Sequence, residues 1–252
     1  MLSNHTLSIV TGCRDRESFL LQVLPTWLQE KAVDEIIIVD WSSAVPLRET
    51  LADFLTLNRN RLKVAVAHNQ TRWNASKCRN LGLQVATGDI VLRLDSDVIL
   101  YPGFPSQHPM RRGVFYARTP HRPSPLWGTC LVWRRDILGV NGYNERLIGY
   151  GWEDDDLFNR LQYFGLSQLG VDFSLLKHID HNDELRLANQ PEKADSPLPP
   201  TLHSTFRNQK IAAQDPWTSS DHMTYWRAVP DDDILICTPL TNEVLHEQNS
   251  VQ

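Results

Sequence analysis

Apolar and polar positions follow two different rhythms along the first hundred residues of the chain. One rhythm is a short, nearly continuous apolar run, which predicts a strand; a run rich in β-branched residues predicts a strand covered on both faces. These runs occupy residues 7–12 ("LSIVTG"), 34–43 ("DEIIIVDWSS"), 62–69 ("LKVAVAHN") and 89–100 ("DIVLRLDSDVIL"). The other rhythm places apolar residues three and four positions apart, as an amphipathic helix does. It occupies residues 16–30 and 73–89.

Three punctuating residues refine the two predicted helices. Pro25 lies within the first helix, where its ring and missing N–H predict a kink or a break. Asn74 is a candidate cap for the second helix, and Gly88 stands just past its end. Strands that alternate with helices predict an α/β fold with a mostly parallel sheet. Ligands bind beyond the carboxyl ends of such strands, which here are residues 11–16, 40–43 and 95–97.

The pattern is less regular after residue 100. Residues 129–133 predict a strand, and a further strand is expected within residues 166–183. The polar stretch 184–200 has the composition of an exposed loop, and the residues after 241 that of a frayed tail. The whole length of 252 residues suits one large domain or two small ones, and we expect a single domain.

Two short polar motifs suggest a metal site. Asp95 and Asp97 follow the apolar run that begins at residue 89, and in an extended chain their carboxylates point the same way. Oxygen ligands of this kind suit magnesium or manganese, although a polar strand end followed by a turn has the same sequence. His178 and His181 in "HIDH" are spaced to share one ion, or to form an ordinary surface pair. Together with Asp97 they make an oxygen and nitrogen ligand set that suits manganese.

Four consecutive acids form the most unusual stretch of the sequence. They are the centre of "GYGWEDDDLFNRL", residues 149–161, and the apolar positions behind them predict a helix. The amides and dipole of a helix N-terminus favour negative charge there. Part of the run therefore caps the helix, and the remaining acids are available to act as a general base toward a hydroxyl group. A capped surface helix with excess charge is the alternative.

Composition excludes several classes of function. The net charge of -5 gives no electrostatic case for a nucleic-acid partner. The four cysteines, Cys13, Cys78, Cys130 and Cys237, form no C-x-x-C pair, so we expect reduced thiols and a cytoplasmic protein, and we expect Cys13 to be a buried apolar side chain. We find no signal peptide and no apolar stretch of membrane-spanning length, which leaves peripheral membrane contact open.

The order of these motifs resembles a known family. "GYGWEDDDLFNRL" resembles the acceptor and catalytic motif of β-1,4-galactosyltransferases and of chondroitin-type N-acetylgalactosaminyltransferases. "CRDR", "SKCRNLGLQVATGDIVLRLDSDV", "LWGTCLVWRRDILGVNGYNE" and "HIDH" resemble, in the same order, motifs of inverting glycosyltransferases of family 2 and of the galactosyltransferases. The resemblance covers roughly residues 7–183. It implies the GT-A fold, a Rossmann-like, mostly parallel sheet flanked by helices.

The resemblance also implies a reaction and a set of site residues. The chain would transfer a hexose or N-acetylhexosamine from a UDP-sugar to a hydroxyl of a carbohydrate or glycoconjugate acceptor, with Mn²⁺ or Mg²⁺ as cofactor. Asp154 would be the catalytic base, and the implied acceptor residues are Trp152, Glu153 and Asp155. The implied metal ligands are Asp97, His178 and His181. The implied nucleotide-sugar residues are Thr11, Arg14, Arg16, Asp40, Lys77, Asn80, Asp95 and Gly128. Residues 1–100 would form the nucleotide-binding half, 101–240 the acceptor and metal half, and 241–252 the tail.

Some features depart from the family or leave alternatives. Trp152 directly precedes Glu153, where the galactosyltransferases have intervening glycines. A nucleotide-sugar nucleotidyltransferase would need a glycine-rich loop that "TGCRDRE" lacks, and a non-catalytic carbohydrate-binding relative is expected to lose one of the site residues. A metallohydrolase of nucleotide sugars is the third alternative. Residues 203–210 ("HSTFRNQK") are expected to be either a mobile lid or an exposed loop. Trp217 and Trp226 are either an acceptor platform or packing residues.

Overall fold

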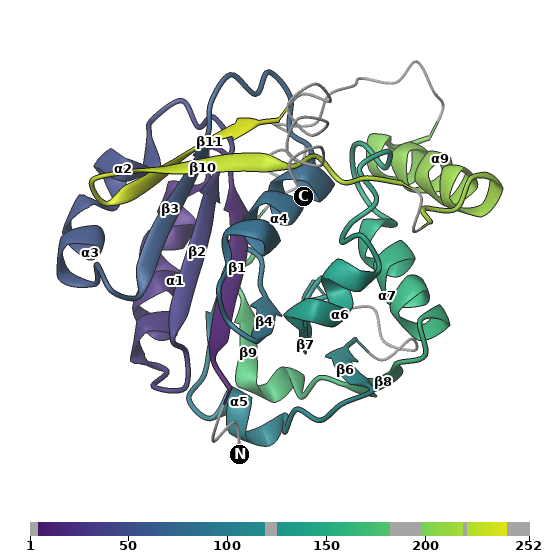
Figure 1. Ribbon diagram of the computed structural model, residues 1–252, viewed down its shortest axis with the longest axis horizontal. Helices are drawn as coiled ribbons and strands as arrows, with labels where there is room; N and C mark the ends of the chain where they lie inside the picture. Colours follow the sequence, from purple (N-terminus) through teal and green to yellow (C-terminus); the bar gives the residue numbers. More distant parts are fainter. Residues whose placement is uncertain (1–4, 119–124, 182–197, 219–220, 241–252) are drawn as a thin grey trace, which may run out of the picture.

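The computed structural model describes residues 5–118, 125–181, 198–218 and 221–240, and every structural statement below refers to these residues (Figure 1). Within them, a main sheet runs in the order β10, β11, β3, β2, β1, β4, β7, β6, β8. These strands are β1 Leu7–Cys13, β2 Glu35–Asp40, β3 Leu62–Ala67, β4 Ile90–Arg93, β6 Val114–Ala117, β7 Cys130–Trp133, β8 Ser167–Gly170, β10 Trp226–Asp231 and β11 Ile234–Pro239. A small second sheet pairs β5 Val98–Leu100 with β9 Leu176–His178.

Helices connect and cover these strands. They are α1 Glu17–Gln29, α2 Leu47–Thr50, α3 Ala52–Leu57, α4 Ala75–Val85, α5 Phe104–Gln107, α6 Arg134–Gly139, α7 Glu153–Tyr163 and α9 Pro200–Gln214, with a 3₁₀ turn η1 at Phe173–Leu175. None of the helices in the described ranges combines the length and the hydropathy that a membrane span requires.

The centre of the main sheet is parallel, as the sequence predicts. β1 lies between β2 and β4 and is parallel to both, β3 is parallel to β2, and β11 is parallel to β3. Antiparallel pairs join β4 to β7, β7 to β6 and β10 to β11. The sheet is therefore mixed and mostly parallel, which confirms the predicted fold class. The carboxyl ends of β1, β2 and β4 meet at one edge, where a ligand site is expected.

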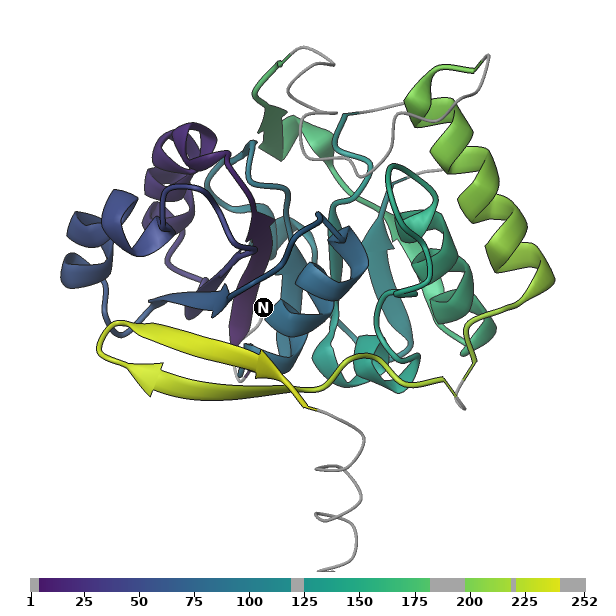
Figure 2. The ribbon, with the colours of Figure 1, turned by 90° about the horizontal axis from the view of Figure 1, so that it is seen from above.

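The central strands of the sheet are buried on both faces because an apolar layer covers each face. α1 packs on one face, where Leu20 and Trp27 contact the cluster that contains Ile9 of β1. α4 packs on the other face, where Leu81 joins the cluster that contains Val10. Figure 2 shows the sheet between these two helices. Ile9 and Val10 face opposite sides of the sheet and each meets an apolar layer, so the middle of β1 is apolar on both faces.

Pro25 neither ends α1 nor divides it, so the prediction of a break there is wrong. The helix continues through Pro25 to Gln29. Its buried face includes Val23, Leu24 and Trp27, and the Trp27 indole donates a hydrogen bond to the carbonyl of Val98 at 2.9 Å. Burial of these side chains outweighs the loss of one helical hydrogen bond.

The strand predicted over residues 89–100 is in fact two strands. β4 belongs to the main sheet and β5 to the small one, with a turn between them that contains residues 95–97. The other predicted helix, α4, begins as expected, because the Asn74 side chain accepts a hydrogen bond from the backbone N–H of Lys77. The turn after β4 changes the directions of the two aspartates, as described below.

Two elements near the end of the chain were not predicted. Residues 203–210 lie in α9, a regular helix, so the expectation of an exposed loop is wrong, and the lid stays a prediction. β10 and β11 form a hairpin, and β11 adds to the open edge of β3. The predicted loop at 184–200 lies almost entirely outside the described residues, and the predicted tail after 241 lies wholly outside them.

Candidate active site

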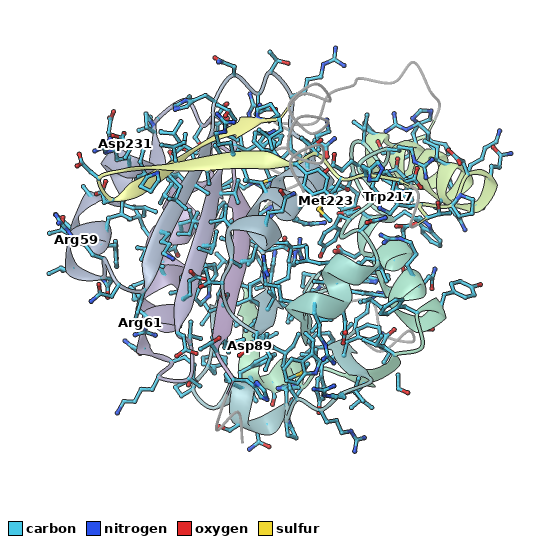
Figure 3. All side chains as sticks on the ribbon, viewed as in Figure 1. Arg59, Arg61, Asp89, Trp217, Met223 and Asp231 are labelled. Atoms are coloured by element: carbon cyan, nitrogen blue, oxygen red, sulfur yellow. The ribbon has the colours of Figure 1, made fainter. Side chains whose placement is uncertain are left out.

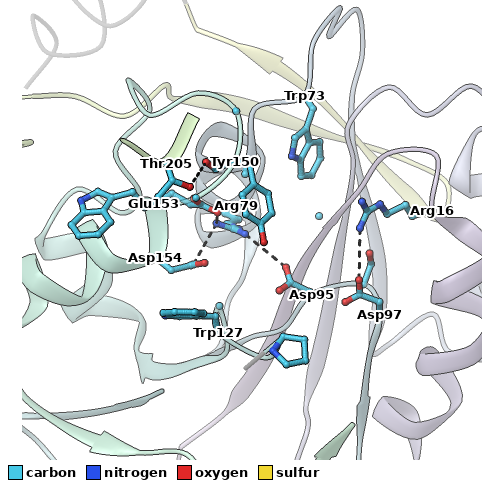
Figure 4. A pocket seen from close by; sticks show the side chains of 18 of the residues that line it. Arg16, Trp73, Arg79, Asp95, Asp97, Trp127, Tyr150, Glu153, Asp154 and Thr205 are labelled. Carbon is cyan, nitrogen blue, oxygen red and sulfur yellow. Dashed lines mark hydrogen bonds and ion pairs between the residues drawn. The ribbon is translucent and has the colours of Figure 1, made fainter. Parts of the chain in front are cut away.

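A cavity of about 610 Å³ lies at the carboxyl edge of the sheet. Its wall is built from the turn after β1, the turn after β4, the start of α4, the loop before β7, the start of α7 and the end of β9. Figure 4 shows that side chains from both halves of the chain converge on it. The cavity therefore lies where a parallel sheet is expected to bind a ligand.

Asp97, His178 and His181 form a three-residue cluster on this wall. Their potential ligand atoms all lie within 4.8 Å of one another. Nε2 of His181 lies 3.0 Å from Oδ2 of Asp97, and Nε2 of His178 lies 3.6 Å from the same oxygen. The antiparallel pairing of Val98 with His178 creates this proximity, because it aligns the residue after Asp97 with the end of β9. The sequence prediction of these three residues as one group agrees with the geometry.

Interactions within the cluster lower the pKa of Asp97 and raise the pKa of His178. Burial raises the pKa of Asp97, but hydrogen bonding and charge from His178, with further contributions from His181 and Arg16, hold it below its usual range. The hydrogen bond to Asp97 raises the pKa of His178 above its usual 6.5. Oδ1 of Asp97 is buried without a hydrogen-bond partner among the described residues. A buried carboxylate oxygen with no donor, beside two imidazoles, is a ligand set that fits Mn²⁺ or Mg²⁺.

Asp95 points away from that cluster, so the expectation that the two aspartates point the same way is wrong. The turn after β4 leaves Asp95 in a bidentate pair with Arg93, at 2.6 and 3.1 Å. Nη2 of Arg79 also lies 3.7 Å from Oδ1 of this carboxylate. Asp97 instead meets the histidines and Arg16, whose guanidinium is 3.7 Å from it. The D-x-D motif therefore divides between two charge networks (Figure 4).

The run of four acids begins α7 and divides between partners. Trp152 precedes the helix with φ of 76°, a left-handed conformation that side chains seldom adopt. Glu153 and Asp154 both face Arg79, while Asp155 pairs with Arg118. These three acids line the cavity. The fourth, Asp156, is buried and pairs with Arg160 of its own helix at 2.7 Å.

Burial sets the protonation of two of the cavity acids. It raises the pKa of Glu153, and the neighbouring charge of Asp154 raises it further against the opposing charge of Arg79. Burial also raises the pKa of Asp155, against the charge of Arg118. Both acids gain proton affinity where they border the cavity, as acids at catalytic sites often do.

The loop before α7 is fixed by α9. The carbonyl of Tyr150 accepts a hydrogen bond from the Thr205 hydroxyl at 3.2 Å, and that of Gly151 accepts one from the Asn208 amide at 2.8 Å. A Cβ atom at Gly151 would lie 2.3 Å from the Thr205 hydroxyl, and its φ of 86° also favours glycine. α9 is thus a structural support for this loop, and Thr205 is part of the cavity wall.

Two arginines and an aromatic ring border the cavity near β1. Arg14 donates a hydrogen bond to the carbonyl of Gln70 at 2.9 Å, and Arg16 approaches Asp97. Trp73 stands close to Gly12, where an added Cβ would lie 3.3 Å from the ring. The cations and the indole face together onto a volume large enough for a nucleotide.

Two of the expected nucleotide-sugar residues on β1 and β2 are not on the cavity wall. Thr11 is buried within β1. Asp40 is buried at the end of β2, and its two carboxylate oxygens accept hydrogen bonds from the backbone N–H groups of Ser43 and Leu47, at 2.9 and 3.0 Å. Because both oxygens of Asp40 are occupied by the turn that follows the strand, the structure gives it a structural contact in place of the expected contact with uracil.

The expected residues on α4 are likewise outside the cavity wall. The Asn80 amide donates hydrogen bonds to the Tyr143 carbonyl and to the Glu145 carboxylate, each at 2.9 Å, and is fully buried. Lys77 contributes its backbone N–H to the Asn74 cap. Asn80 therefore fastens the segment before α7 to α4. Gly128, in contrast, lies on the wall as expected.

The sequence analysis did not predict several wall residues, among them Trp73, Arg79, Trp127 and Tyr150. Trp127 stacks against the Arg118 guanidinium at 4.2 Å, and Arg79 is the partner of three acids. Tyr150 was visible as an aromatic residue beside the acid run.

The tryptophans that were considered as an acceptor platform lie elsewhere. Trp217 is buried and hydrogen-bonded to the Asn141 carbonyl, on the α9 side in Figure 3. Trp226 packs against Trp41 with ring centroids 5.7 Å apart. All four cysteines are free and buried, which confirms the expected burial of Cys13, and burial raises the pKa of Cys13 to about 12.

Two family comparisons match consecutive parts of the chain. Residues 8–107 match the family described as glycosyl transferase family 2, and residues 116–182 match the family described as the N-terminal domain of galactosyltransferase. No curated protein matches the sequence significantly. The first match contains Asp95 and Asp97, and the second contains α7 and the two histidines.

Solved structures share the fold at low sequence identity. The catalytic domain of Drosophila β1,4-galactosyltransferase 7, in complex with xylobiose, is 17% identical with a TM-score of 0.57, over 96% of this chain and 97% of that one. A mutant of that enzyme, in complex with manganese, UDP-Gal and xylobiose, gives a TM-score of 0.58. GalNAc-T7 with UDP, GalNAc and Mn²⁺ is 16% identical with a TM-score of 0.64, over 84% of this chain and 50% of that one. The mannosyltransferase PcManGT from Pyrobaculum calidifontis, with GDP-Man and Mn²⁺, is 13% identical with a TM-score of 0.58, over 84% and 76%.

The fold and the two family matches define the chain as a glycosyltransferase of the GT-A type. Within that class, its second half carries the galactosyltransferase match, and the part of the sequence that matches includes the acid run and the histidine pair.

Proposed function

We propose that this glycosyltransferase is a metal-dependent, inverting enzyme that moves a hexose or N-acetylhexosamine from a UDP-sugar to a hydroxyl of a carbohydrate or glycoconjugate. The observation that carries the proposal is the shared cavity. It brings the Asp97, His178 and His181 cluster, two arginines and the acidic start of α7 onto one wall. The cluster and the arginines would stabilise the negative charge of the leaving group, and an acid of α7 would take the proton from the acceptor.

Asp97, His178 and His181 would hold the metal ion, and a bound Mn²⁺ or Mg²⁺ would neutralise charge on the departing diphosphate. Arg14 and Arg16 border the same region and supply positive charge toward the phosphates. Trp73 presents an aromatic face on which the nucleotide base can stack. Manganese with UDP, UDP-Gal or GDP-Man in the structurally similar proteins supports this arrangement.

Asp154 is the proposed general base. The acceptor oxygen attacks the anomeric carbon from the face opposite UDP, the bond from that carbon to the UDP oxygen breaks, and UDP leaves with the bonding electrons. The acceptor proton passes to the Asp154 carboxylate, which lies on the cavity wall. One displacement with no covalent intermediate inverts the configuration of the sugar. Trp152, Glu153 and Asp155 would contact the acceptor.

Calorimetric titration of UDP with and without Mn²⁺, followed by UDP-Gal, UDP-GalNAc, UDP-Glc and UDP-GlcNAc, tests the donor. We expect binding that requires the metal and one preferred sugar. No UDP binding under either condition would refute the donor assignment. For the base, Asp154→Asn is expected to abolish transfer and to leave the UDP and metal affinities nearly unchanged, because the amide cannot accept the proton. Equal losses of transfer and of binding would show that Asp154 is structural.

A cytoplasmic location is part of the proposal. It is supported by four free and buried thiols, which reducing compartments preserve. Fractionation of the source cells with a redox-sensitive thiol label tests it: we expect the four cysteines to be recovered reduced in the cytoplasmic fraction.

A further inference from the structure

Arg79 occupies the centre of the acidic wall. Its Nη1 donates hydrogen bonds to Oε1 of Glu153 at 3.1 Å and to Oδ1 of Asp154 at 3.4 Å. Its Nη2 lies 3.7 Å from Oδ1 of Asp95. The guanidinium stacks over the Tyr143 ring at 5.0 Å, and only 11% of the side chain is exposed. One planar cation is thus held between three carboxylates (Figure 4).

A second buried arginine supports the first. Arg93 projects from β4 with 3% of its side chain exposed and holds Asp95 in a bidentate pair. Asp95 in turn reaches Arg79. Gly128 makes this possible, because a Cβ atom there would lie 1.8 Å from Nη1 of Arg93 and 2.9 Å from Oδ2 of Asp154. The series Arg93, Asp95, Arg79 and Asp154 therefore runs from the central sheet to the start of α7.

We propose that Arg79 is the positioning residue of the general base, an inference that rests on the proposed role of Asp154. By binding Oδ1, Arg79 fixes the carboxylate so that Oδ2 is left to take the acceptor proton. Oδ2 borders the space beside Gly128, which lies on the cavity wall. Arg93 holds Asp95, and Asp95 in turn keeps the Arg79 guanidinium in place.

The shape of the guanidinium is essential to this role. A planar fork can hold Glu153, Asp154 and Asp95 at once, whereas the compact ammonium of lysine is a point charge. Arg79 and Arg93 are both buried among the three acids, so their positive charges also offset the negative charges of those acids. The fork therefore keeps the base aligned, and the positive charge offsets the acids around it.

Three variants separate these two contributions. Arg79→Gln removes charge and fork, Arg79→Lys keeps the charge alone, and Arg79→Ala opens space for an added guanidinium ion. UDP release from the four UDP-sugars, with water or sugar as acceptor, gives kcat, KM and their pH profiles. For Arg79→Gln we expect kcat to fall roughly 100-fold with little change in KM, since a small misplacement of a catalytic group costs about that much. Its acid limb should differ from that of the wild type, because the three acids around Arg79 lose their shared positive charge.

Arg79→Lys should keep the acid limb of the wild type and still lose kcat. Guanidinium chloride in the low-millimolar range should restore part of the activity of Arg79→Ala, whereas urea, a neutral molecule of similar shape, should not. Arg61→Gln is the matched control. Arg61, labelled in Figure 3, donates hydrogen bonds to the carbonyls of Leu28, Glu30 and Val33 and is not on the cavity wall, so its loss should affect stability alone.

The outcomes distinguish two failures. If the wild-type protein releases no UDP from any donor, the proposed function is refuted, and the role of Arg79 with it. If Asp154→Asn is inactive but folded Arg79→Gln keeps both kcat and the acid limb, the positioning role alone is refuted. If circular dichroism shows that Arg79→Gln is unfolded, Arg79→Lys and the rescue of Arg79→Ala decide the question. An Arg79→Lys protein with the kcat of the wild type refutes the need for the fork.

Discussion

Replacement of Gly128 by alanine tests the packing between the sheet and the acidic wall. The added Cβ would lie 1.8 Å from Nη1 of Arg93 and 2.8 Å from its Cζ. Carbon and nitrogen atoms in contact are separated by about 3.5 Å, so the Arg93 guanidinium must move by more than about 1.5 Å. Neither hydrogen bond to Asp95, at 2.6 and 3.1 Å, can survive a shift of that size.

The expected energetic cost follows from these contacts. A hydrogen bond to a charged group contributes about 1.5–3 kcal/mol, and Arg93 is buried, so we expect Gly128→Ala to lower the free energy of unfolding by about 2–4 kcal/mol. For a domain of this size, 1 kcal/mol corresponds to roughly 2–4 °C in Tm. A decrease of about 5–15 °C is therefore expected in thermal denaturation followed by circular dichroism, together with a loss of transfer activity.

A double-mutant cycle decides whether the clash is the cause. In an Arg93→Ala background the obstructing guanidinium is gone, so the further cost of Gly128→Ala should fall to that of displacing the Asp154 carboxylate, whose Oδ2 would lie 2.9 Å from the added Cβ. Gly139→Ala is the matched control, since the nearest atom to its added Cβ is a Phe164 carbon at 3.3 Å, on a side chain that can give way. A change in Tm below about 2 °C for Gly128→Ala, or equal costs with and without Arg93, would refute the reasoning.

Three further outcomes follow from the metal cluster and the buried thiols. His181→Ala should weaken Mn²⁺ binding at least about tenfold in calorimetry, as loss of a direct ligand should exceed the loss of an outer partner; an unchanged affinity would remove His181 from the site. Because hydrogen bonding raises the pKa of His178 above 6.5 and a protonated imidazole cannot bind a metal, Mn²⁺ affinity should rise with pH through the range above 6.5; a flat profile from pH 6 to 8 would contradict this. Native protein should react slowly with a thiol reagent until unfolded, since burial raises the pKa of Cys13 to about 12 and of Cys237 to about 11; rapid reaction of two or more thiols would contradict the burial.

The first half of the fold was predictable because its signals are local. Each central strand is buried on both faces, so it contains a run of apolar residues, as at 36–39 in β2. The cap of α4 was also predictable, because Asn74 acts on an amide three residues away. Pro25 was misjudged because the packing of α1 outweighs a local preference, and that packing depends on residues far away in the sequence.

The hairpin at the end of the chain has no comparable signal. β10 is exposed along most of its length and contains Pro230. Its partner β11 pairs with β3, although most of the sequence separates these two strands. α9 has few apolar positions on its buried side, where Asn208 is the one fully buried residue among those described. A pattern within about a dozen residues cannot predict the pairing of strands that lie so far apart in the sequence.

The candidate site was partly predictable for a chemical reason. Carboxylates and imidazoles in unusual runs stand out in a sequence, so the cluster of Asp97, His178 and His181 and the acids of α7 were predicted. Their counter-charges were not found, because an arginine such as Arg79 or Arg93 looks ordinary until its burial is known. Asp40 and Asn80 show the opposite error, since each is a polar residue in a promising position that satisfies the backbone or a neighbouring side chain.

The pairing of β11 with β3 has a consequence for synthesis on the ribosome. β3 emerges early, yet its outer edge is covered only when residues 234–237 arrive to pair with residues 64–67. Contacts so distant in sequence form slowly and delay completion of the sheet. During that interval the nascent chain presents an unpaired edge strand, a surface on which other chains can add. Chaperone occupancy of nascent chains should therefore fall once β11 has left the exit tunnel.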